Sequence, residues 1–116
     1  MPTDVFSKPA DAPQRLILAS KVIGLAIYDV DGERIGHIDD VAIDKRDGEI
    51  AYAIAAVGDF LGLGGKYSPI PWSKLLYDPK KDGYAVQLTH DQLRKAPSYG
   101  KDELADIGAS QTWVFI

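Results

Sequence analysis

The chain has 116 residues, of which 46% are hydrophobic and none is cysteine. This length suits one domain that closes its own core, and the lack of cysteine excludes disulfides, thiolate nucleophiles and cysteine-ligated metal sites. The net charge of -4 argues against a dedicated nucleic-acid binder, because such proteins present a basic face. No apolar run approaches the roughly 18–20 residues of a membrane-spanning helix, and no signal peptide opens the chain. We therefore expect a cytoplasmic protein without an integral membrane anchor.

The first part of the chain predicts an extended arm followed by an all-β meander. Residues 1–14 hold three prolines among small and polar residues, which is typical of a segment that orders only by docking. Three Asp-Gly pairs then separate apolar runs, at Asp31-Gly32, Asp47-Gly48 and Asp82-Gly83. Asp-Gly favours tight hairpin turns because both residues tolerate positive φ.

Six strands follow from these turns. They are predicted over 25–29, 34–44, 49–57, 67–71, 76–78 and 84–88. Gly36 indicates a bulge or bend in the second strand, as a small curved barrel requires. The prolines at 69 and 71 place the fourth strand at an edge or rim.

The third strand has a bulky face and a small face. The bulky residues are Ile50, Tyr52, Ile54 and Ala56, and the small ones are Ala51, Ala53, Ala55 and Val57. We expect the bulky set to face the core and the small set to lie against a helix or a second subunit.

Two short helices are predicted after the last strand. Thr89 and Gln92 have the spacing of a capping box, and this helix must end before Pro97. A second helix is expected over 101–107, within a tail of residues 100–116 that ends on the apolar Trp113–Ile116.

The charged and histidine residues predict no catalytic site, metal site or cofactor. Asp29 begins a stretch like a calcium loop, but its glycine is the fourth residue rather than the sixth, so turn aspartates are the better interpretation. His37 and His90 could pair with neighbouring carboxylates, yet no nucleophile accompanies them. The basic residues are scattered, so no nucleic-acid partner is expected.

Residues 58–65 are rich in glycine but fit neither phosphate-binding fingerprint. A hairpin connection is the simpler interpretation of this segment. It leaves Phe60, Leu61 and Leu63 unexplained, because apolar residues at a loop tip either fold over the barrel end or meet a partner.

Several segments of this sequence occur in the same order as in a known protein family. Residues 22–36 are similar to an opening strand, hairpin and bend, and residues 44–50 to a second hairpin. The segment 57–65 followed by 67–72 is the most specific phrase, and residues 88–99 are similar to a closing helix. Together, residues 20–99 resemble the PRC-barrel family, which includes the cytoplasmic domain of the photosynthetic reaction-centre H subunit and the C-terminal half of the 16S ribosome maturation factor M. Asp59 and Gly65 depart from the glycine and glutamate common at these positions.

The resemblance implies an all-β fold over residues 15–99, a small six-stranded, partly open PRC-type barrel with a short C-terminal helix. It also implies a non-enzymatic module. We hypothesise protein interaction or assembly with self-association, as a homodimer, because small barrels leave free edges. The expected partner-binding residues are aromatic or apolar side chains of the loop, the rim and the tail: Phe60, Leu61, Leu63, Tyr67, Trp72, Trp113 and Phe115.

Two other functions remain open. A small-molecule or quinone-type binding barrel would use proton-handling carboxylates such as Asp39 and Asp40, and would predict a cavity near the Phe60 loop. An accessory factor in RNA processing or ribosome maturation would bind ribosomal particles in a salt-dependent way. Peripheral contact with a membrane complex is compatible with either an assembly or a binding role.

Overall fold

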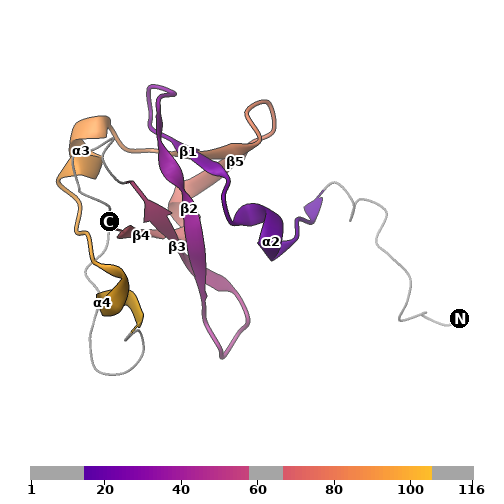
Figure 1. Cartoon of the computed structure of the whole chain (residues 1–116). Helices are drawn as coiled ribbons and strands as arrows, with labels where there is room; N and C mark the ends of the chain where they lie inside the picture. Colours follow the sequence, from indigo (N-terminus) through magenta and orange to yellow (C-terminus); the bar gives the residue numbers. More distant parts are fainter. Residues whose placement is uncertain (1–14, 58–66, 106–116) are drawn as a thin grey trace, which may run out of the picture.

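The computed structural model describes residues 15–57 and 67–105, and the six strands among them form one sheet (Figure 1). The strands are β1 (Ala26–Tyr28), β2 (Arg34–Ile43), β3 (Ile50–Ala56), β4 (Tyr67–Pro71), β5 (Leu75–Asp78) and β6 (Gly83–Val86). They pair in the order β4-β3-β2-β1-β6-β5, antiparallel except for the parallel pair β1–β6. This mixed sheet curls into a half-barrel, which confirms the predicted partly open architecture.

Short helices complete the described fold. They are α2 (Ala19–Val22), the 3-10 turn η2 (Trp72–Lys74), α3 (His90–Arg94) and α4 (Lys101–Ala105). The sequence did not predict α2, because this single turn has no side-chain cap to mark its start. Within the described residues, no helix is long and apolar enough to cross a membrane.

The three Asp-Gly turns form as predicted, although not all in the same way. Gly32 and Gly48 adopt positive φ angles of 83° and 78°. In the third turn it is Asp82 that has positive φ, at 48°, and Gly83 is the first residue of β6. Each turn therefore places its left-handed residue where a glycine or aspartate tolerates it.

The prediction for the faces of β3 was wrong. Ala53, Ala55 and Val57, from the small set, belong to the hydrophobic core, together with isoleucines of β1, β2 and β4. The reason is curvature: side chains converge on the concave face of a strongly bent sheet, so alanine fits there and larger neighbours fill the remaining space. Ile54, on the opposite face, is also buried, at 5% exposure, beside the buried Pro69 of β4.

The predicted irregularity at Gly36 is confirmed. Ile27 pairs with Gly36 and Tyr28 with Arg34, so Ile35 is an extra residue on β2 and its side chain is fully buried. A Cβ atom on Gly36 would lie 2.1 Å from the carbonyl oxygen of Ala56. The glycine thus allows β2 and β3 to approach more closely than any side chain would permit.

Replacing this glycine should destabilise the barrel. We expect Gly36→Ala to lower the free energy of unfolding by about 2 kcal/mol or more, because the methyl group meets a backbone atom that cannot rotate away. Urea denaturation followed by circular dichroism measures the change. Gly100→Ala is the matched control, since its Cβ would lie 3.6 Å from the nearest atom, and an equal loss in both variants would contradict the argument.

Candidate interaction surface

The edge of the sheet at β4 is closed to further pairing. Tyr67 and Tyr99 exchange two backbone hydrogen bonds, each 2.8 Å long, so the segment between α3 and α4 lies along this strand. Pro69 and Pro71 follow Tyr67 at alternate positions and have no N–H to offer on the same side. An incoming strand would find few donors here.

The opposite edge, at β5, differs from β4. Among the described residues, no strand pairs with the outer side of β5. Two of its four residues are exposed apolar side chains, Leu76 at 57% and Tyr77 at 46%. The strand has four residues, which limits the number of backbone hydrogen bonds that this edge can offer.

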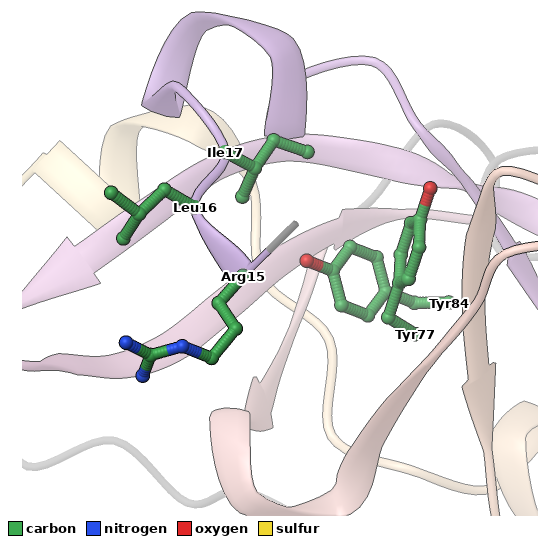
Figure 2. A pocket seen from close by; sticks show the side chains of 5 residues that line it. All are labelled: Arg15, Leu16, Ile17, Tyr77 and Tyr84. Carbon is green, nitrogen blue, oxygen red and sulfur yellow. The ribbon is translucent and has the colours of Figure 1, made fainter. Parts of the chain in front are cut away.

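A pocket of about 220 Å³ opens beside β5 (Figure 2). Arg15, Leu16 and Ile17 line one side of it, and Tyr77 and Tyr84 line the other. Leu16 is 73% exposed and Ile17 44%, so much of the lining is apolar surface in contact with water. We call the side chains of Leu16, Ile17, Tyr77 and Tyr84 the β5 patch.

An aromatic cluster forms the floor of the β5 patch. The ring of Tyr84 lies 5.2 Å from that of Trp72 and 5.5 Å from that of Tyr77, both in inclined orientations that aromatic pairs prefer. Burial raises the pKa of Tyr84. The hydroxyl of Tyr77 donates a 2.6 Å hydrogen bond to Asp82, and this contact raises the pKa of Tyr77. Both phenols therefore stay neutral at physiological pH, and the patch suits an apolar partner.

A family model for the PRC-barrel domain matches residues 15–93. The chain belongs to the PRC-barrel family. The match agrees with the resemblance read from the sequence and with the observed half-barrel. PRC barrels are small β-barrel modules that are generally non-catalytic. No curated protein matches the chain.

The structure places two of the partner-binding residues predicted on this PRC barrel. Tyr67 is half-buried in β4, at the closed edge, and its backbone is paired with Tyr99. Trp72 is half-buried in η2, where it packs against the core and Tyr84. The other predicted residues lie outside the described part of the chain: Phe60, Leu61, Leu63, Trp113 and Phe115. Their role in binding stays a prediction.

The carboxylates proposed for proton handling do not line the pocket beside β5. Asp39 is the extra residue of a second bulge, since Ile38 pairs with Ala55 and Asp40 with Ile54. Asp40 is exposed, and its carboxylate accepts a 2.8 Å hydrogen bond from the N–H of Val41. Proton handling by these two residues stays a prediction.

The β5 patch itself was missed by sequence reasoning. Leu16 and Ile17 precede the first predicted strand. No motif in the neighbouring residues indicates that their side chains lie beside the fifth strand. The apolar run of residues 16–18 was the available signal in the sequence, and the structure shows that these side chains are exposed.

The hydrogen bond at the rim of the β5 patch gives a direct test of its geometry. We expect Asp82→Asn to lower the pKa of Tyr77 toward its ordinary value, because the negative charge that holds the phenol proton is removed. Asparagine tolerates the positive φ of this position, so the turn is kept. Titration of the tyrosine ring signals by NMR measures the change, and Tyr84, whose pKa is raised by burial, is the internal control. An unchanged Tyr77 would mean that the contact does not form in solution.

Proposed function

We propose that this PRC barrel is a non-enzymatic assembly module that self-associates through its β5 edge. The observation that carries the proposal is the difference between the two edges of the sheet. The β4 edge is occupied by Tyr99 and interrupted by prolines, whereas β5 offers an edge with exposed apolar side chains. An unprotected edge strand is a template for pairing with another chain.

A second copy is the occupant that this edge fits best. Two β5 strands can pair antiparallel about a two-fold axis, which presents the same residues from both copies and extends the sheet across the interface. A four-residue strand supplies few backbone hydrogen bonds, so apolar contacts must contribute most of the affinity. Leu76 on the strand and Leu16 in the β5 patch are exposed enough to supply them, at about 1.5–3 kcal/mol for each side chain that becomes fully buried.

The alternative functions receive less support from the described residues. The pocket beside β5 holds no carboxylate, so it offers a quinone-type ligand no proton-handling group of the predicted kind. Several basic side chains are paired with acids, as in Arg46–Asp44 and Lys95–Asp91, and these pairs reduce the positive potential available to RNA.

Two matched substitutions test self-association through β5. We expect Leu76→Lys to weaken the dimer by about tenfold or more, because a charged side chain at a sheet edge opposes pairing. Ile43→Lys is the control, since Ile43 has nearly the same exposure, 56% against 57%, but lies on β2, away from β5 in the order of the sheet. Sedimentation equilibrium of the full chain and both variants measures the dissociation constants.

Two results would contradict the proposal. One is a wild-type chain that stays monomeric at the highest concentration measured. The other is an equal weakening by both lysine variants, which would indicate a general charge effect instead of an interface at β5.

A further inference from the structure

A second group of side chains lies where the first hairpin meets α3, and the interaction surface does not account for it. One potential ligand atom from each of Asp29, Glu33 and His90 lies within 4.8 Å of the other two. In the sequence, His90 follows Glu33 by more than fifty positions, so only the fold brings them together.

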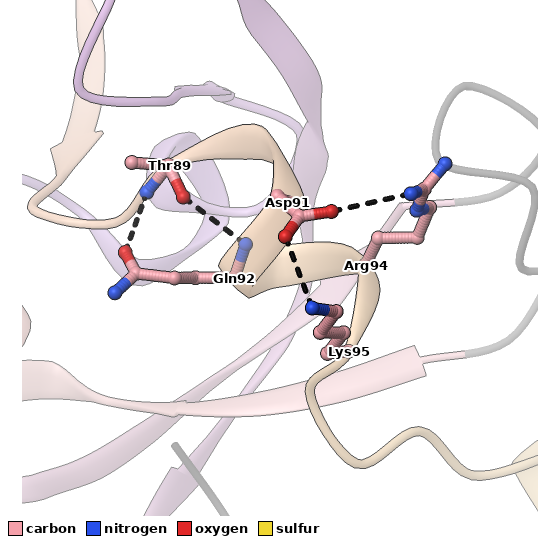
Figure 3. Close-up of polar contacts among 5 residues, drawn as sticks. All are labelled: Thr89, Asp91, Gln92, Arg94 and Lys95. Carbon is pink, nitrogen blue, oxygen red and sulfur yellow. Dashed lines mark hydrogen bonds and ion pairs between the residues drawn. The ribbon is translucent and has the colours of Figure 1, made fainter.

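A backbone contact and a helix cap place His90. The N–H of Val30, next to Asp29, donates a 3.0 Å hydrogen bond to the carbonyl of Leu88, just before α3. Thr89 then caps the helix: its hydroxyl accepts from the N–H of Gln92 at 3.1 Å, and its own N–H donates to the Gln92 side chain at 2.9 Å (Figure 3). This confirms the predicted capping box. The histidine is therefore held beside the hairpin loop by contacts on both sides of it.

The hairpin loop holds the carboxylate of Asp29 and the backbone of Glu33 through hydrogen bonds. Asp29 is 2% exposed, and its Oδ1 atom accepts hydrogen bonds from the N–H groups of Asp31 and Glu33, both at 2.9 Å. The N–H of Asp29 donates to the carbonyl of Glu33 at 2.8 Å and closes the loop. These contacts fix the Asp29 carboxylate and the Glu33 backbone within the loop, and the hydrogen bond from Val30 to Leu88 joins that loop to the start of α3.

The other carboxylate oxygen of Asp29 has no such partner. Oδ2 is buried and accepts no hydrogen bond within the part of the chain that the structure describes. Buried polar atoms are almost always paired, because losing water without gaining a partner is unfavourable. An unpaired anionic oxygen next to a second carboxylate and an imidazole is the arrangement that a cation would satisfy.

We propose that Asp29, Glu33 and His90 bind a divalent transition-metal ion, with Zn²⁺ as the best representative. Imidazole nitrogen and carboxylate oxygen are both ligands of Zn²⁺, whereas Ca²⁺ and Mg²⁺ favour oxygen alone. Ligand atoms bound to one zinc ion lie about 3.4 Å apart in tetrahedral geometry. The Glu33 side chain is exposed, and its rotation is the movement by which the cluster would reach that spacing. Because Oδ1 of Asp29 is already hydrogen-bonded to the loop, the ligand is oriented before the metal arrives.

Calorimetric titration of the full chain with ZnCl₂ alone tests the site. We expect one saturable site, about 10- to 100-fold weaker binding in Glu33→Gln and in His90→Gln, and weaker binding of CaCl₂ than of ZnCl₂. His37→Gln is the matched control, because it removes the other histidine of the chain, which lies on β2 outside the cluster. Its affinity for Zn²⁺ should equal that of the wild type.

Asp29→Asn separates metal binding from folding. Asparagine keeps an oxygen that can accept both loop hydrogen bonds but replaces the unpaired Oδ2 by a donor group, so the metal-free variant should melt at or above the wild-type temperature. Zn²⁺ should raise the melting temperature of the wild type and leave that of Asp29→Asn unchanged. The proposal is overturned if Zn²⁺ does not bind saturably, if His37→Gln weakens binding as much as His90→Gln, or if Glu33→Gln leaves the affinity unchanged.

Discussion

The close approach of β2 to β3 at Gly36 is the constraint on which the rest of this barrel depends. A sheet of six short strands can enclose a core only if it bends sharply, and the bend requires a position where backbone meets backbone. The extra residue Ile35 lies next to that position and turns its side chain into the core. The inward alanines of β3 follow from the same bend, because the isoleucines of neighbouring strands converge on them and fill the concave face.

The two outer strands of the sheet, β4 and β5, are adjacent along the chain but differ in how their free edges are covered. Residues 72–74 connect β4 directly to β5, so the chain crosses the gap of the half-barrel with a single 3-10 turn and leaves the two strands unpaired with each other. The chain protects them unequally: β4 has prolines and a bridging tyrosine, and β5 has a patch of aromatic and aliphatic side chains. Among the described residues the two edges therefore differ, and the proposed self-association through β5 depends on this difference.

Local signals in the sequence predicted the local parts of this structure. The Asp-Gly turns and the Thr89 cap depend on residues a few positions apart, and their positions were predicted closely. The inward face of β3 could not be predicted, because alternation alone does not reveal the curvature that favours alanine over isoleucine. The grouping of Asp29 with His90 could not be predicted either. It depends on the pairing of β1 with β6, which are the first and last strands along the chain.

The parallel pair β1–β6 has a consequence for how this protein folds. All other strand pairs join neighbours along the chain, whereas the pairing of Ile27 with Tyr84 closes a loop that contains the four strands β2, β3, β4 and β5. Closing so long a loop has an entropic cost, so we expect this pairing to form late in folding. The hairpin loop and α3 are joined next to this pairing, so we expect them to become neighbours at the same step. A metal ion bound between the hairpin loop and α3 would therefore bind only the fully folded barrel, and it would slow unfolding of the β1–β6 pair.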